Sequence, residues 1–227
     1  MIKISLIQLF DTKDKFMKYV NIYNERYRAH SDSKSLYLSV IDKHKKTPNY
    51  RDLLKDDSFY HLVYDTLESW NMNMRGAELV DFPTFEWSIK KNTEQLSLIR
   101  GYRLEYLRRD EQLETIFKNL WLLFNGLSVM KTHSKIVGVS KTLHFLLPNL
   151  VMPIDRRNIL DLLYLGGRYR KEAEKEFNDF KDIFREYIGL ARYLGLSEGD
   201  VTGVGWNTSI PKIIDNAIIG FLLSISR

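Results

Sequence analysis

Asp155 and Lys141 are the residues of this 227-residue chain whose types and surroundings best suit chemistry. Asp155 follows an apolar, proline-containing stretch at 150–154 and directly precedes Arg156 and Arg157. An aspartate placed before a helix accepts hydrogen bonds from its first backbone N–H groups, and these bonds stabilise its negative charge. Such a carboxylate can also stabilise a cationic, oxocarbenium-like sugar or orient a water molecule. The sequence leaves open whether Asp155 does more than cap the helix.

The residues just before Lys141 allow two interpretations, which differ in the role of Gly138. In the first, residues 134–147 form one helix, and Gly138 packs closely against a neighbouring element. In the second, residues 138–140 form a tight hairpin whose N–H groups approach a phosphate, and Lys141 adds positive charge. The sequence favours the first interpretation without excluding the second.

Arginine clusters could supply contacts to an anionic partner. The segment 100–109 interleaves arginines with two tyrosines, which suits phosphate contact and base stacking, although such runs are usually solvated helix faces. A second cluster follows Asp155 at 156–170. The expected nucleic-acid contacts from these clusters are Arg103, Arg108, Arg156, Arg157, Arg168 and Arg170.

The order of features in residues 134–165 resembles the core signature of the helix-hairpin-helix DNA glycosylases. Those enzymes have a glycine hairpin, a lysine, an apolar helix, a proline-containing extension that ends in aspartate, and then a basic helix. The resemblance implies that Gly138 and Ser140 contact phosphates. It also implies that Lys141 is the nucleophile used by some members, and that Asp155 is the catalytic acidic residue.

The whole chain also resembles a family of small uncharacterised microbial proteins. These share the motif SKxLHxLLPxLxxPIDR and a second motif near the C-terminus. Thr208, Ser209, Lys212 and Asp215 carry the second motif in this chain. This resemblance implies no function.

Several chemistries are excluded by what the sequence lacks. It has no cysteine, which excludes disulfides, thiolate metal sites and cysteine nucleophiles. The five histidines show no metal-ligand spacing, and the glycines at 202–207 follow no apolar strand. We therefore expect no metal and no cofactor. His144 is interpreted as a core residue whose ring nitrogens are hydrogen-bonded.

Net charge and the lengths of the apolar runs indicate which partners and which cellular location to expect. Thirty-four Lys and Arg against 29 Asp and Glu give a net charge of +5, which mildly favours DNA or another polyanion as partner. The longest apolar run near the end, 217–223, is far too short to cross a bilayer, and no signal peptide is evident. These features predict a cytoplasmic protein with no membrane association.

Helical spacing of apolar residues dominates the chain and predicts an all-α fold. The clearest segments are 16–27, 59–70 and 113–127, and the third has the strongest stripe, which predicts a central helix. Weak alternation is confined to Ile2, Ile4 and Leu6, so little or no sheet is expected.

Capping residues predict where helices begin and end. Asp81 before Pro83 predicts one start, and Thr208 or Ser209 before Pro211 predicts another. Gly166 and Gly167 predict a helix end after Leu165.

The organisation that follows is a multi-helix globular domain over residues 1–227, with lobes at 1–110 and 111–227 as an alternative division. A helix-hairpin-helix-like element would lie in the second lobe. The predicted function is nucleic-acid binding with base-excision-like chemistry. A non-catalytic helical binding or scaffolding protein and a small-molecule phosphate binder are the alternatives.

Overall fold

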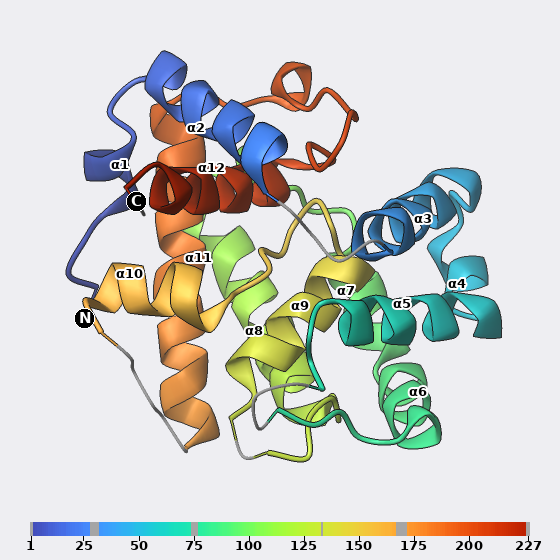
Figure 1. Cartoon of the computed structure of the whole chain (residues 1–227). Helices are drawn as coiled ribbons and strands as arrows, with labels where there is room; N and C mark the ends of the chain where they lie inside the picture. Colours follow the sequence, from blue (N-terminus) through green and yellow to red (C-terminus); the bar gives the residue numbers. More distant parts are fainter. Residues whose placement is uncertain (1, 28–31, 74–76, 133, 167–171, 226–227) are drawn as a thin grey trace.

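The computed structural model of the chain is built from α-helices joined by irregular segments (Figure 1). The structure describes residues 2–27, 32–73, 77–132, 134–166 and 172–225. The α-helices of these residues are α1 (Leu6–Leu9), α2 (Lys13–Arg26), α3 (Ser33–Lys46), α4 (Tyr50–Leu53), α5 (Asp57–Ser69), α6 (Phe82–Lys91), α7 (Thr93–Ile99), α8 (Asp110–Gly126), α9 (Ile136–Leu146), α10 (Asp161–Tyr164), α11 (Ala173–Tyr193) and α12 (Ile210–Ile225). Short η1 (Leu104–Tyr106), η2 (Arg156–Leu160) and η3 (Glu198–Asp200) complete them.

The all-α prediction is confirmed. The described ranges contain no strand, and the only β-type pairing within them is an isolated antiparallel bridge between Leu79 and Met130. The weak alternation at the N-terminus does not form a strand, because α1 begins at Leu6.

Two of the predicted helix starts are confirmed by their capping bonds. The Asp81 carboxylate accepts the Thr84 N–H at 2.9 Å at the start of α6, and Pro83 occupies its first turn. The Ser209 hydroxyl accepts the Lys212 N–H at 3.4 Å at the start of α12. In both helices the cap satisfies an N–H group that has no partner within the helix.

The predicted helix end is confirmed at α10. Leu165, just past the last residue of α10, has a φ of 51°, and Gly166 has a φ of 120°. Gly166 takes this conformation without the steric cost that Leu165 bears. Gly167 lies outside the described residues.

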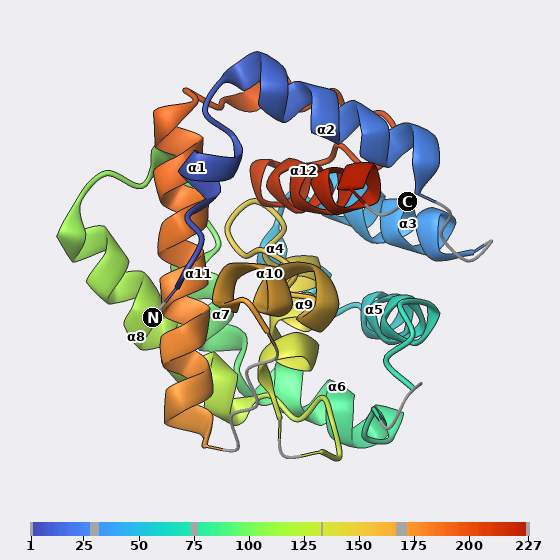
Figure 2. The same cartoon turned by 60° about the vertical axis from the view of Figure 1, so that its left-hand side comes forward.

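Helices α2 and α12 lie side by side and join the two ends of the chain (Figures 1 and 2). Their backbones approach closely at Gly220, where an added Cβ would lie 1.9 Å from the Tyr19 carbonyl oxygen. Helix α11 crosses beside them, and α3 to α6 lie on the other side of the molecule from α11. The α2–α12 contact thus links residues 1–110 to residues 111–227, the two lobes considered above.

The most deeply buried helices are α9 and α12, and the prediction of a central helix at 113–127 is wrong. In α9 every residue except Val137 is buried, and in α12 every residue from Ile210 to Gly220 is buried. Helix α8 buries one face only. A single apolar stripe fits a helix packed on one side, whereas a helix that is apolar all round lies in the core.

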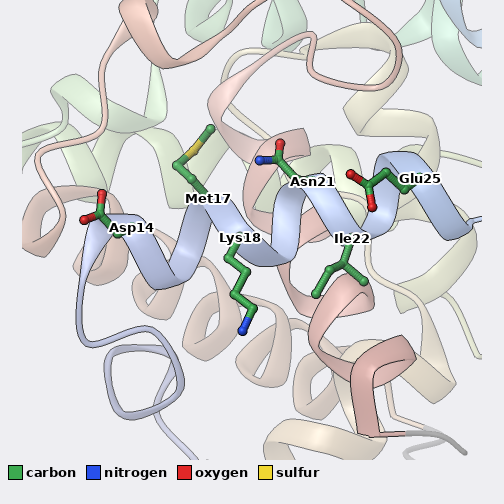
Figure 3. Close-up of a pocket in the computed structure, with 6 residues that line it drawn as sticks. All are labelled: Asp14, Met17, Lys18, Asn21, Ile22 and Glu25. Carbon is green, nitrogen blue, oxygen red and sulfur yellow. The ribbon is translucent and has the colours of Figure 1, made fainter.

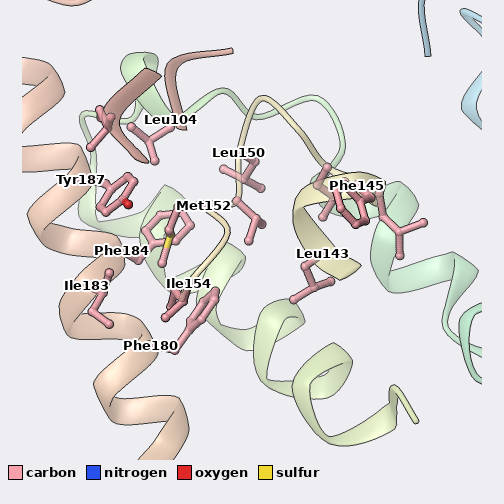
Figure 4. Packing of buried hydrophobic residues seen from close by; sticks show 14 of the residues in the cluster. Leu104, Leu143, Phe145, Leu150, Met152, Ile154, Phe180, Ile183, Phe184 and Tyr187 are labelled. Carbon is pink, nitrogen blue, oxygen red and sulfur yellow. The ribbon is translucent and has the colours of Figure 1, made fainter. Parts of the chain in front are cut away.

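The segment 147–155 runs from α9 toward η2 and carries Asp155 at its end; it begins with a turn at 147–150 and continues as irregular backbone. Its side chains Met152 and Ile154 point toward Phe180 and Phe184 of α11 (Figure 4). These four side chains are fully buried. Burial of apolar area on this scale fixes the segment against α11.

Two hydrogen bonds fix the same segment to α9. The Ser140 hydroxyl accepts the Ile154 N–H at 3.0 Å, and Nδ1 of His144 donates to the Val151 carbonyl at 2.7 Å. Packing on one side and hydrogen bonds on the other therefore hold the backbone next to Asp155 in one place.

Candidate functional site

The structure brings Lys141 and Asp155 together. The Lys141 Nζ lies 3.6 Å from the Asp155 Oδ2, and the two side chains are 8% and 37% exposed. Lys141 comes from the middle of α9, and Asp155 ends the segment that α9 and α11 hold. The two residues named from the sequence thus share one site, which the sequence could not establish.

Asp155 is an N-cap, as predicted, and it also faces Lys141. Its Oδ1 accepts the N–H groups of Arg157 and Asn158 at 3.0 and 3.2 Å. Its Oδ2 is the oxygen near Lys141. The turn that Asp155 caps, η2, is a single π-helical turn, a feature often found at functional sites.

The Lys141 ammonium group is buried among weak partners. Its Nζ lies 3.6 Å from the Met72 Sδ and 5.7 Å from the centre of the Trp70 ring. No described residue gives it a hydrogen bond to oxygen or nitrogen, and Asp155 is beyond normal hydrogen-bond distance. A charged donor this deeply buried is costly unless an acceptor is supplied.

A second ion pair lies in the first turns of α12. Unlike Lys141, its lysine donates hydrogen bonds to oxygen acceptors. The Lys212 Nζ donates to the Asp215 Oδ2 at 2.6 Å and to the Asn216 Oδ1 at 2.8 Å. Asn216 in turn donates to the Trp206 carbonyl and to the Asn207 side chain. This pair is nearly inaccessible, with side chains 2% and 5% exposed. Its hydrogen bonds offset the cost of burying two charges.

Aromatic rings surround Lys212. Its Nζ lies 5.1 Å from the Tyr23 ring centre, 5.3 Å from that of Trp206 and 5.6 Å from that of Trp70. These distances suit cation–π attraction. Because Lys141 also faces Trp70, one indole ring contacts both ammonium groups.

The two ion pairs form one cluster, called the four-charge cluster below: Lys141, Asp155, Lys212 and Asp215. Burial lowers the pKa of Lys212, Asp215 opposes this shift, and the charge of Lys141 adds to it. Burial raises the pKa of Asp215, Lys212 opposes this shift, and the charge of Asp155 adds to it. The charges of Lys141 and Asp155 therefore reach the Lys212–Asp215 pair.

Tyr27 forms the accessible edge of the rings around the cluster. It stacks on Tyr23 with ring centres 4.6 Å apart and is 37% exposed. Burial, followed by the charges of Asp215 and Asp155, raises the pKa of Tyr27. The Tyr27 hydroxyl therefore lies within electrostatic reach of both carboxylates.

His144 is a core residue, as predicted. Because a carbonyl only accepts, Nδ1 carries the proton donated to Val151, and Nε2 accepts from the Tyr37 hydroxyl at 3.1 Å. The Tyr37 hydroxyl then accepts from Thr208, 2.5 Å away. Burial lowers the pKa of His144 to about 3, so the ring is neutral at neutral pH.

The hairpin interpretation of residues 138–140 is wrong. Helix α9 begins at Ile136, so both Gly138 and Ser140 lie inside it, and both are buried. A Cβ on Gly138 would lie 2.6 Å from the Met130 Cγ, which explains the glycine by close packing. The Ser140 hydroxyl accepts a hydrogen bond from the Ile154 N–H. Neither residue is placed to contact a phosphate, and Ser140 positions the segment that carries Asp155.

The expected arginine contacts are separated by the fold. Arg103 pairs with Glu105 at 2.8 Å and with Glu198, and Arg108 is exposed and donates to the Leu107 carbonyl at 3.2 Å. Their segment is irregular apart from the short η1, so it is not the helix face suggested above.

The remaining expected contacts lie near Asp155 in the sequence. Arg156 is partly buried, with its guanidinium 3.5 Å from the Ser134 hydroxyl, and Arg157 is exposed. Arg168 and Arg170 lie outside the described residues. Of the six arginines, only Arg156 and Arg157 are thus shown beside the four-charge cluster.

A surface hollow lies elsewhere, along the outer face of α2 (Figure 3). It is lined by Asp14, Met17, Lys18, Asn21, Ile22 and Glu25. None of these residues belongs to the four-charge cluster. A hollow bordered by one helix brings no catalytic groups together, so we place the candidate site at the cluster.

The described residues contain neither a cluster of metal ligands nor a helix that could span a bilayer. No group of three or more histidine, aspartate or glutamate side chains there could hold a metal ion. No helix there is both long and apolar enough to cross a bilayer.

The sequence assigns no role to the inner part of the site, which consists of Lys212, Asp215 and the rings around them. Trp70, Trp206 and Tyr27 come from separate segments, and no spacing joins them. Lys212 and Asp215 did leave a signal: they lie three residues apart in a helix that is otherwise almost entirely apolar. Opposite charges at that spacing on a buried helix indicate an internal ion pair.

Comparison of the chain with protein-family models, with curated proteins and with solved structures found no match. The two resemblances described above therefore stay predictions. The geometry of the four-charge cluster is the basis for the functional proposal.

Proposed function

We propose that the chain binds nucleic acid and releases a base at the Lys141–Asp155 pair. The observation that carries this proposal is the 3.6 Å approach of the two side chains at a partly exposed edge. A carboxylate that is both capped by N–H groups and accessible meets the requirement for stabilising positive charge on a sugar.

In this mechanism Asp155 acts on the breaking bond between sugar and base. As the base leaves with the bonding electrons, positive charge develops on the sugar, and the carboxylate stabilises it. A nucleophile then forms the new bond to C1′, and the proton that it releases neutralises the departing base. The nucleophile is either the unprotonated Lys141 amine or a water molecule, and in the second case Lys141 stays protonated. Arg156 and Arg157 lie next to Asp155 in the chain and supply positive charge for the nucleic-acid backbone.

A non-catalytic helical binding protein is the second candidate. The capping bonds of Asp155 favour this candidate, because capping alone is a sufficient structural reason for an aspartate at this position. The two candidates differ in one respect, since only the first requires base release.

The test is a pair of measurements on the wild-type protein. Affinity for labelled single- and double-stranded DNA and RNA is measured from about 50 to 200 mM salt, where binding through several phosphates weakens steeply. Base release is then measured on oligonucleotides that each carry one damaged or mismatched base. Salt-dependent binding with release from at least one substrate supports the proposal. Binding without release leaves the second candidate, and absence of binding at low salt contradicts nucleic-acid recognition altogether.

A further inference from the structure

The Lys141–Asp155 pair presents a donor and an acceptor side by side. The ammonium group has no hydrogen bond to oxygen or nitrogen from the described residues, although its side chain is more than nine-tenths buried. The Asp155 Oδ2 faces it at 3.6 Å, while the cap bonds occupy Oδ1. Lys212, in the same cluster, has both its oxygen acceptors within 2.8 Å. The contrast shows that only the outer pair has hydrogen-bonding capacity to offer a ligand.

Charge selects a neutral ligand group for this pair. An anion placed on Lys141 would lie close to the Asp155 carboxylate and would be repelled by it. A cation placed on Asp155 would be repelled by the Lys141 ammonium group. The rings of Tyr23 and Trp206 could not bind it instead, because they already surround Lys212. A neutral group with an acceptor next to a donor satisfies both members at once, since the acceptor takes an ammonium N–H and the donor serves the carboxylate.

The neighbouring rings select a flat ligand. Trp70 is partly buried and lies against Lys141, and Tyr27 is partly exposed within electrostatic reach of Asp155. Aromatic side chains next to hydrogen-bonding groups are the usual means of reading a base that has left its stack. A ring that bears a carbonyl beside an N–H combines these requirements.

We propose that the Lys141–Asp155 pair recognises the lactam edge of an oxo-purine or oxo-pyrimidine. The Lys141 ammonium donates to the ring carbonyl, and the ring N–H donates to the Asp155 Oδ2. Uracil, thymine, guanine and hypoxanthine have this edge, whereas adenine and cytosine lack a carbonyl flanked by a ring N–H. The inference rests on the proposed function for the source of the base. Because the lactam edge lies across the ring from the glycosidic bond, the pair holds this edge in the released base or in a free nucleoside, a binding event separate from the step at C1′.

The experiment compares nucleosides that differ by one methyl group on the ring nitrogen. Binding of uridine and 3-methyluridine, and of inosine and 1-methylinosine, is measured by ligand-observed NMR on the wild-type protein. We expect each parent nucleoside to bind at least tenfold more tightly than its methylated form. This comparison needs no variant, so it does not depend on whether a substituted protein folds.

Variants then assign the discrimination to the pair. Lys141→Met and Asp155→Asn should each remove the difference between uridine and 3-methyluridine. Lys46→Met, on the surface of α3, and Asp81→Asn, at the cap of α6, should retain it. Equal binding of parent and methylated nucleosides, absence of nucleoside binding, or discrimination that survives both pair variants would overturn the inference.

The inference and the proposed function can fail separately. Lactam-selective nucleoside binding without any DNA binding or base release would retain the inference and reject the function. Base release together with equal binding of parent and methylated nucleosides would retain the function and reject the inference.

Discussion

Replacing Lys212 by methionine tests how much the buried Lys212–Asp215 ion pair contributes to the free energy of unfolding. The substitution leaves the Asp215 carboxylate, which is 5% exposed, without the ammonium at 2.6 Å, and it removes the donor to Asn216. Breaking a buried pair by removing one partner costs about 3–5 kcal/mol, because the other charge stays uncompensated. Methionine keeps most of the aliphatic packing among the rings, so the loss reports mainly on charge.

The assay is urea unfolding at neutral pH of four proteins: the wild type, Lys212→Met, Asp215→Leu and the double variant. We expect each single variant to lose about 3–5 kcal/mol of unfolding free energy and the double variant to lose less than the sum, because no charge is left unpaired. Lys46→Met is the matched control, since its ion pair with Asp42 has a similar distance of 2.7 Å but is 75% and 51% exposed. Exposed pairs contribute little. Losses that are strictly additive, or single-variant losses as small as that of the control, would refute the reasoning.

Three other predictions follow from single residues. Gly220→Ala should lower the unfolding free energy by about 3 kcal/mol or more, the upper end of the range typical of overpacking, because the new Cβ would lie 1.9 Å from a backbone oxygen of α2. Gly101→Ala is the control: an added Cβ there has nothing within 4 Å, so its unfolding free energy should stay close to that of the wild type. His144 has a pKa of about 3 when folded and 6.5 in its unperturbed state, so the unfolded chain binds more protons between these values. The unfolding free energy should therefore fall by up to about 1.4 kcal/mol per pH unit on acidification below about 6.5, and unfolding of His144→Gln should lack this component of the pH slope. Leu165→Gly should leave stability unchanged or raise it by up to about 1 kcal/mol, because glycine accepts the φ of 51° that costs a leucine; a clear loss in melting temperature would contradict this.

Local chemistry was the part of the fold that the sequence predicted well. The caps at Asp81, Ser209 and Asp155 were visible, because a cap involves only residues a few positions apart. The core role of His144 was also expected. The choice between helix and hairpin at Gly138 was not settled, because it depends on the contact with Met130, which belongs to another segment.

The candidate site could be predicted only in part, because its inner members depend on tertiary packing. Asp155 and Lys141 were named from the order of features around them, but their distance depends on how the segment 147–155 packs between α9 and α11. Trp70, which follows α5, meets Lys212 of α12 only through tertiary packing. Tyr23 reaches the same ammonium group from α2. No local pattern encodes such a meeting.

The measurement that tests the central claim most directly is the rate of base release by Asp155→Asn, compared with Asp81→Asn and the wild type. Both variants exchange an N-cap carboxylate for an amide, which caps about as well, so neither should unfold. Only Asp155→Asn removes a charge beside Lys141. We predict that this variant binds DNA with wild-type affinity and releases no base, while Asp81→Asn releases base at the wild-type rate. Wild-type base release by Asp155→Asn would contradict the account and leave Asp155 as a cap alone.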